Sequence, residues 1–349
     1  MSTLTIGGTS ISPGSRLYLD LPIAQLHTHT PMTMPIRVWR GKKDGPRLFV
    51  SAAIHGDELN GVEIIRRLMN HKALSLLRGT LIAIPIVNVY GVIQYSRYLP
   101  DRRDLNRNFP GHERGSLAGR LANLFMKEIV ANATHGIDLH TGALNRNNLP
   151  QIRANMKDEA TSKLAHAFGV PLLIDSQLRD GSLREAAAEY GIPMLLYEAG
   201  EALRFDEVSI RAGVKGIINV MRTLEMLPAI KRRKKRPYEP TVVNATSWVR
   251  APESGILRAL VPLGSRVKRD QLLGVIASPF GDQEYEVKTP YAGIVIGRTN
   301  LPLTNEGDAL FHIARVQGVR AAEESVGNFT EELAAEEPMP APFSDAPIT

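Results

Sequence analysis

The feature that most constrains this fold is a regular alternation of apolar, strand-like runs with helix-like segments between residues 47 and 227. The runs "RLFVSAAI" (47–54) and "IPMLLYEAG" (192–200) have the length and composition of buried strands. Between them lie segments with helical spacing of apolar residues, and a long one follows at 206–227. Such alternation predicts an α/β fold: a mixed, mostly parallel sheet with helices on both faces.

The pattern changes after residue 230. Prolines bracket the basic run "KRRKKR" (231–236), which indicates a linker, and the following segment reads as short strands with Gly and Pro turns. Its two halves resemble each other, which favours a small all-β, barrel-sandwich-like domain. The predicted organisation is a catalytic domain (1–230), a basic linker (231–240), a β-rich accessory domain (241–317) and an acidic, disordered tail (318–349).

Composition limits the function classes. The net charge of +6 would fall to zero without the six basic residues of 231–236, so we expect a solvated segment there and no nucleic-acid partner. The chain contains no Cys, so a metal site must be built from His and carboxylate side chains. We find neither a secretory signal pattern nor an apolar run of about 18 residues, and we therefore expect no membrane association and a cytoplasmic protein.

Two histidines stand where predicted strands end. His55 ends the strand of "SAAIHGDELNG", Glu58 follows about one helical turn later, and His140 ends the strand of "DLHTG". The carboxyl ends of parallel strands meet at one edge of a sheet, so these side chains can converge. Two imidazoles and a carboxylate form a normal zinc set with one position open for water. His27 and His29 in "LHTHT" are competing ligands, and His55 alone could be a hydrogen-bonded core histidine.

Hydrolysis by a zinc-bound water would also need a side chain that accepts and donates protons. Glu198 ends a strongly apolar strand in "LLYEAGE", where burial beside a cation would suit it to accept a proton from water. A salt-bridge role is the alternative. Asp138, two residues before His140, is expected to orient that imidazole.

The loop "SRYLPDRRDLNRNFPG" (96–111) concentrates guanidinium groups around Asn106. Arginine binds carboxylates with two parallel hydrogen bonds, so the loop predicts a carboxylate clamp and contacts to a developing oxyanion. Asp104 is expected to orient one of these arginines. The basic residues of the loop are Arg97, Arg102, Arg103 and Arg107.

Four motifs in this order, "AAIHGDELNG", "SRYLPDRRDLNRNFPG", "DLHTG" and "YEAG", resemble the succinylglutamate desuccinylase/aspartoacylase family of zinc carboxypeptidase-like hydrolases. The resemblance spans roughly residues 35 to 316. It implies a zinc carboxypeptidase-like fold and one zinc ion per subunit. The residues implied as zinc ligands are His55, Glu58 and His140.

The same resemblance implies roles for the remaining site residues. Glu198 would be the general base and acid, Asn106 and Arg107 would bind the substrate's carboxylate, and Arg97 would polarise the scissile carbonyl. This sequence has two more residues between Arg97 and "DLNR" than some members of the family, so Arg102 and Arg103 stay open for the role of polarising the carbonyl.

The sequence therefore predicts a zinc-dependent deacylase of small N-acyl amino acids, with oligomerisation left open. A metallocarboxypeptidase acting on short peptides is the main alternative. A metal-binding module without catalysis, and nucleic-acid binding through 231–236, are further alternatives.

Overall fold

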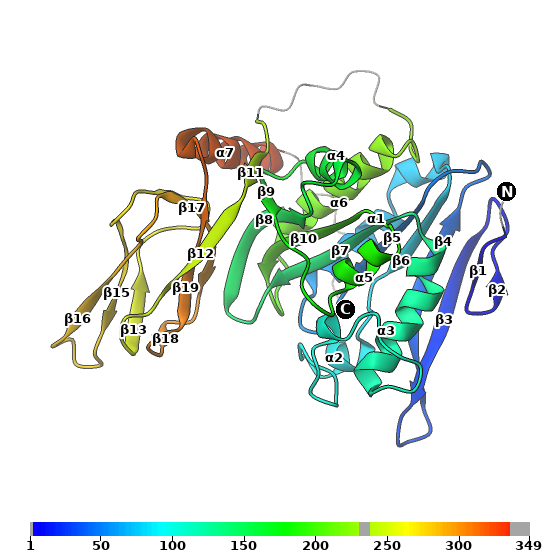
Figure 1. Ribbon diagram of the computed structural model, residues 1–349, viewed down its shortest axis with the longest axis horizontal. Helices are drawn as coiled ribbons and strands as arrows, with labels where there is room; N and C mark the ends of the chain where they lie inside the picture. The colour runs from blue at the N-terminus through cyan, green and yellow to red at the C-terminus, as the bar shows by residue number, and fades with distance from the viewer. Residues whose placement is uncertain (1–2, 230–237, 336–349) are drawn as a thin grey trace, which may run out of the picture.

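A computed structural model describes residues 3–229 and 238–335. Its framework is one large mixed sheet in the order β12-β19-β17-β8-β10-β7-β5-β6-β4-β3, with β9, β11 and β14 joined at its side (Figure 1). The strands of this sheet are β3 (Arg16–Gln25), β4 (Pro31–Arg40), β5 (Arg47–Ala52), β6 (Thr80–Ile84), β7 (His135–Gly142), β8 (Arg146–Ala154), β9 (Leu172–Asp175), β10 (Met194–Glu201), β11 (Thr241–Val243), β12 (Ala245–Arg250), β14 (Arg266–Val267), β17 (Gly293–Thr299) and β19 (Ala309–Arg315).

The α/β class and the mixed sheet are confirmed, but "mostly parallel" is wrong for the sheet as a whole. The four central strands β6, β5, β7 and β10 are mutually parallel, and so are the β8–β9 and β9–β11 pairs. The other pairs of this sheet are antiparallel. Among them, β3 and β4 form a hairpin, and β8 runs against β10. The parallel centre matters for function, since its strands end at a common edge.

Helices cover both faces of the parallel centre. The core on one face joins α1 (Asn60–Met69), α4 (Glu159–Phe168) and α6 (Glu207–Thr223) to side chains such as Val50 and Leu139. The opposite core joins α3 (Leu117–Glu128) and α5 (Leu183–Glu189) to Phe49 and its neighbours. Alternate strand residues thus enter different cores, as the strand period of two requires. The short helix α2 (Val89–Ile93) lies beside β4.

Residues 241–316 contain strands and turns only, as expected from the sequence. Five of these strands belong to the large sheet: β17 pairs with β8, β19 and β12 follow it, β14 pairs with β17, and β11 pairs with β9. A second sheet packs against them through apolar side chains that include Val249, Leu273 and Phe311. It consists of β13 (Gly255–Ala259), β15 (Leu272–Ala277), β16 (Glu284–Lys288) and β18 (Leu303–Thr304). The accessory strands therefore divide into a continuation of the sheet that carries the predicted site and a second sheet packed against it.

The acidic tail was expected to be disordered from residue 318, which is wrong for its first half. Residues Val319–Ala335 form the helix α7 beside β17 and α6 (Figure 1). Ala322, Val326, Phe329 and Leu333 recur at helical spacing and are buried, so the segment is amphipathic despite its acidic composition. The basic run 231–236 and residues 336–349 lie outside the described residues, so the linker boundaries stay predictions.

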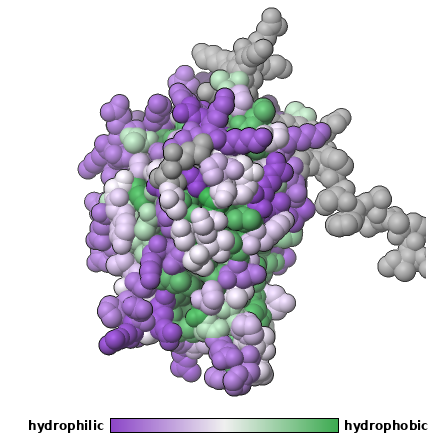
Figure 2. Space-filling view, turned by 90° about the vertical axis from the view of Figure 1, so that its right-hand side faces the viewer, coloured by the Kyte–Doolittle hydropathy of each residue, from purple (hydrophilic) through white to green (hydrophobic). Residues whose placement is uncertain are grey.

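Among the described residues, no helix has both the length and the apolar composition needed to cross a bilayer. On the face shown in Figure 2, apolar side chains lie interspersed among polar and charged ones. A small separate hairpin, β1 (Thr5–Ile6) with β2 (Thr9–Ser10), lies near the N-terminus.

Candidate active site

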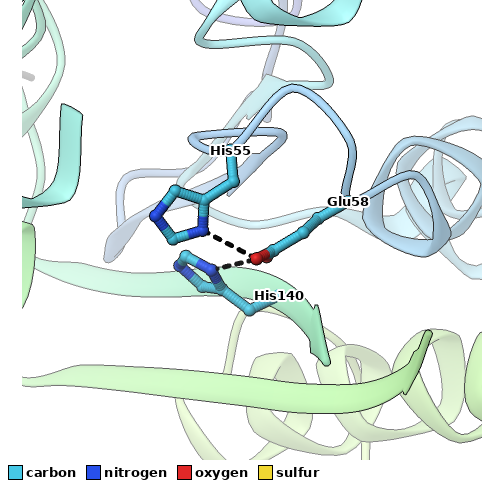
Figure 3. Close-up of side chains that lie close together, drawn as sticks. All are labelled: His55, Glu58 and His140. Carbon is cyan, nitrogen blue, oxygen red and sulfur yellow. Dashed lines mark hydrogen bonds and ion pairs between the residues drawn. The ribbon is translucent and has the colours of Figure 1, made fainter. Parts of the chain in front are cut away.

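Three side chains from two distant parts of the chain meet at the carboxyl edge of the parallel strands (Figure 3). His55 follows β5, Glu58 lies in the turn before α1, and His140 is on β7. The Nδ1 atoms of the two imidazoles lie 2.7 and 2.8 Å from the two oxygens of Glu58. All three residues are buried, and their ligand atoms lie within 4.8 Å of one another. The predicted convergence of these residues is therefore present.

The turn after β5 has the backbone needed to bring His55 here. Ala53 adopts a left-handed φ of 52°, which L-residues seldom do without surrounding restraint. Gly56 follows His55, and a Cβ atom there would lie 2.0 Å from the backbone carbon of Gly91. Only glycine allows the two backbone segments to approach so closely. Both features hold the imidazole close to the arginine-rich loop that follows α2.

The second nitrogen of each imidazole is held by a carboxylate. His140 Nε2 lies 2.6 Å from Asp138, which also accepts a hydrogen bond of 2.8 Å from the Ser51 hydroxyl. His55 Nε2 lies 3.1 Å from Asp104. The carboxylates fix the ring orientations so that both Nδ1 atoms face Glu58, which is the second-layer arrangement expected around metal-binding histidines. The expected role of Asp138 in orienting His140 agrees with this geometry.

The buried carboxylates and imidazoles of this group strongly shift one another's pKa values. Burial opposes ionisation of Glu58, but the two histidines outweigh it and hold the pKa of that carboxyl well below its ordinary value. Burial alone would lower the pKa of His140, yet Asp138 and Glu58 raise it well above 6.5. Two imidazole nitrogens and an ionised carboxylate in a buried position form a donor set suited to a divalent cation.

Glu198 stands next to this group. It is the register partner of His140 on the adjacent parallel strand β10, and of Gln151 on the other neighbour, β8. Arg153 on β8 donates from Nε to the Glu198 carboxylate at 2.5 Å. The sequence left two roles open for Glu198, proton transfer or a salt bridge. The structure is compatible with both, since Glu198 lies beside the candidate metal centre and also forms an ion pair.

The loop 96–111 enters the same region, with Arg97 as its innermost arginine. Arg97 donates to Asp104 at 3.0 Å and to Glu58 at 3.3 Å, so Asp104 does orient an arginine. Asn106 is buried, and its side-chain oxygen accepts a hydrogen bond from the Leu183 amide, leaving the amide nitrogen for another partner. Arg107 lines the cleft beside it. Arg102 and Arg103 are exposed and do not line the cleft.

These residues line a cleft of about 390 Å³. Several of its other lining residues were not predicted from the sequence. Besides Arg97 and Arg107, the arginines that line it are Arg146, Arg153, Arg179 and Arg184. The β-rich part of the chain also lines the cleft, through Trp248 on β12 and His312 on β19. The competing ligands His27 and His29 are exposed at the far end of the β3–β4 hairpin, which excludes them from this centre.

Fold and site together define a mixed α/β protein with a His-Glu-His candidate metal centre at the carboxyl edge of its sheet. The model of the succinylglutamate desuccinylase/aspartoacylase catalytic domain matches residues 44–224, so the chain belongs to this family of deacylases. The N-alpha-acetyl-L-2,4-diaminobutyric acid deacetylase of Halomonas elongata is 26% identical over 314 residues, which cover 86% of this chain and 91% of that one. Deacylases of this kind hydrolyse amide bonds.

Solved structures show the same fold. A succinylglutamate desuccinylase from Silicibacter sp. TM1040 superposes with a TM-score of 0.77 at 22% identity, covering 87% of this chain and 95% of that one. The product-bound ectoine utilization protein EutE from Ruegeria pomeroyi gives a TM-score of 0.76 at 24% identity, covering 86% and 95%. The coverage extends beyond residue 224, so the likeness includes strands of the β-rich part.

Proposed function

We propose that this protein is a zinc-dependent amide hydrolase that removes the acyl group from small N-acyl amino acids. One observation carries the proposal: a buried His-Glu-His donor group lies beside a strand-end glutamate in a cleft rich in arginine. Family membership supports the reaction class, and the deacetylase of Halomonas elongata supports an acylated amino acid as substrate.

The donor set fits zinc. His55, Glu58 and His140 would hold the ion with two nitrogens and one oxygen, and the carboxylates behind both imidazoles favour the required tautomers. A bound zinc ion would supply Lewis acidity, lowering the pKa of water to about 7 and polarising an acyl carbonyl.

Glu198 is the proposed proton carrier. Its carboxylate accepts a proton from the attacking water and then delivers it to the leaving nitrogen. Arg153 and Gln151 both donate to the same carboxylate oxygen, Oε2, so the other oxygen is free to face the reacting atoms. The ion pair with Arg153 also fixes the position of the Glu198 carboxylate.

Arg97 and the "DLNR" segment are the proposed contacts to the substrate. Arg97 is held by Asp104 and Glu58, which preorganises its guanidinium beside the reacting carbonyl to stabilise the oxyanion. The Asn106 amide nitrogen and Arg107 would bind the free carboxylate of the amino acid.

The small size of the cleft favours acyl amino acids over peptides. Trp248 and His312 line the same cleft as the donor group, and their rings take up room that a peptide chain would need. A metallocarboxypeptidase acting on short peptides is the second candidate, since the same catalytic groups would serve it.

Metal analysis and a substrate screen test the proposal. The purified protein should contain about one zinc per chain, the stoichiometry that one three-ligand site predicts. It should hydrolyse N-acetyl or N-succinyl amino acids and leave tripeptides intact. The matched control is His27→Ala, which replaces an exposed histidine outside the cleft and should keep activity. Turnover of tripeptides alone would favour the carboxypeptidase. Turnover of neither, by zinc-loaded protein, would overturn the proposed function.

A further inference from the structure

A second cavity lies at the amino ends of the parallel strands, at the opposite edge of the sheet from the candidate active site. Its lining residues stand at the starts of β5 and β6, just before β7, and in the loops that lead into these strands. Its volume of about 380 Å³ lies within the range of small-molecule pockets. We call it the amino-edge pocket. Arg40, Arg47 and Arg78 supply its basic side chains, and Asp44 supplies an acidic one.

The length of β5 separates this pocket from the candidate metal centre. Arg47 is the first residue of β5, and His55 follows the end of the strand. A strand rises about 3.3 Å per residue, so the two ends of β5 lie roughly 17 Å apart. A small ligand in the amino-edge pocket therefore does not reach the His-Glu-His group.

The pocket is built where two backbone segments meet closely. The Gly41 amide donates to the Gly79 carbonyl at 2.8 Å, and the Gly79 amide donates to the Lys43 carbonyl at 3.0 Å. Gly79 has a φ of 76°, and a Cβ atom there would lie 2.1 Å from the Pro46 carbonyl oxygen. Only glycine permits this approach. The β4–β5 loop and the turn before β6 are thus fixed relative to each other.

Two of the three arginines are positioned by backbone carbonyls. Arg40 is buried and donates from Nη1 to the Ile11 carbonyl at 2.5 Å. Arg78 donates from Nε to the Asp44 carbonyl at 2.7 Å. These hydrogen bonds hold both guanidinium groups at the pocket before any ligand arrives, which reduces the entropy lost on binding.

Arg47 is the arginine whose side chain lacks a partner. Its backbone amide and carbonyl both bond to the Thr134 hydroxyl, which ties β5 to the start of β7. In the part of the chain that the structure describes, the partly buried guanidinium of Arg47 makes no hydrogen bond and no ion pair. A partly desolvated cation of this kind gains from an anion that binds next to it.

Positive charge exceeds negative charge around the pocket. Three guanidinium groups and the Asp44 carboxylate leave two positive charges among the described lining residues. Glu225 is exposed and approaches Arg78 only to 4.0 Å. Lys42 and Lys43 are exposed on the same β4–β5 loop and add to the positive field. The pocket is therefore electrostatically suited to an anion with two charges.

We propose that the amino-edge pocket is a binding site for a small phosphate-type anion, either inorganic phosphate or a phosphate monoester. A phosphoryl group carries almost two negative charges and three strong acceptor oxygens, and arginine binds it with paired hydrogen bonds. A carboxylate has one charge and two oxygens, which three guanidinium groups exceed. The inference goes beyond the proposed deacylase function and does not depend on it, because the pocket and the active-site cleft share no lining residue.

Calorimetric titration of the zinc-containing protein with inorganic phosphate, glycerol 3-phosphate and acetate tests the inference. At least one of the two phosphates should bind about 10-fold or more tightly than acetate, because its charge is larger. Tighter binding of glycerol 3-phosphate would identify an ester as the occupant, and tighter binding of inorganic phosphate the free ion. Arg47→Gln should weaken phosphate binding about 10- to 100-fold, as for loss of a hydrogen bond to a charged group.

The active-site cleft is also rich in arginine, so the matched control is Arg179→Gln, which removes one charge from that cleft. It should keep the wild-type phosphate affinity. An unfolding temperature close to that of wild type shows that Arg47→Gln is folded, and Arg78→Gln, at a more exposed position, should weaken binding as well. Equal phosphate affinity in wild type and both pocket variants would overturn the inference. So would loss of binding in Arg179→Gln instead, or wild-type binding of phosphates no tighter than of acetate.

Discussion

Glu198 and His140 are register partners on the adjacent parallel strands β10 and β7. Their side chains are thus fixed beside each other by the backbone ladder of the sheet, and Glu58 bridges from His140 to His55 across the same edge. The proposed proton carrier and a candidate metal ligand are therefore held in place without reliance on a flexible loop. This favours preorganised chemistry, in which no rearrangement accompanies the reaction.

Replacing Glu198 by Gln should separate catalysis from metal binding. The amide keeps the size of the side chain but cannot accept a proton, so kcat should fall by about 10²- to 10⁴-fold, the usual contribution of a general base. Zinc content should not change, because Glu198 is not one of the three donor residues. Initial rates and metal analysis on the same preparation check both statements. A fully active variant with normal zinc would remove Glu198 from the mechanism.

Replacing Asp138 by Asn should weaken metal binding. The carboxylate is 2.6 Å from His140 Nε2 and helps to hold its ring, and removing such a partner typically costs about 10- to 100-fold in metal affinity. Competition titration with a coloured zinc chelator measures the change. Asp158→Asn, which alters the exposed N-cap of α4 outside the cleft lining, is the matched control and should keep the wild-type affinity. Equal affinities for wild type and both variants would contradict the positioning role.

Periodicity predicted where the His-Glu-His group would lie, because its two histidines follow the strongest pattern in the chain. His55 and His140 end apolar strands, and the carboxyl edge of parallel strands is a place that sequence order alone can identify. The linear sequence does not tell how the strands pair, so the antiparallel neighbours of the centre were not predicted.

Strand β8 shows why part of the site was missed. Its sequence, "RNNLPQIRA", is rich in polar residues and includes a proline, so no alternating apolar pattern marks it as a strand. It is a strand because β10 and β17 pair with its two sides. Arg153, the partner of Glu198, is thereby placed by tertiary contacts. His312 and Trp248 were missed for the same reason, since only the joining of β17 to β8 brings them to the cleft.

The helix α7 was not predicted, because the acidic composition of residues 318–349 indicated disorder although their apolar residues recur at helical spacing. Phe329 is buried against Tyr238 at a ring-centroid distance of 5.8 Å. Phe329→Ala should reduce the free energy of unfolding by about 3–5 kcal/mol, as for other buried phenylalanines, or release the helix alone. Thermal unfolding and limited proteolysis distinguish the two results. Glu331→Ala, an exposed change on the same helix, should leave stability within about 0.5 kcal/mol of wild type.

The pH dependence of stability should carry a signature of His312. Its pKa is about 3 in the folded protein, against an ordinary value of 6.5 that applies when the chain is unfolded. Between these two pH values the unfolded state binds more protons, so stability is fully present above pH 6.5 and is lost as the pH falls towards 3.

Other groups also titrate in this window, so the comparison with His312→Phe isolates the effect. The variant cannot gain a proton at this position in either state, and its stability should therefore decline less steeply on acidification than that of wild type. Urea unfolding at a series of pH values from 7 to 4 measures the difference. Parallel stability profiles for the two proteins would mean that His312 is protonated equally in the folded and unfolded states, which would contradict its burial as an uncharged ring.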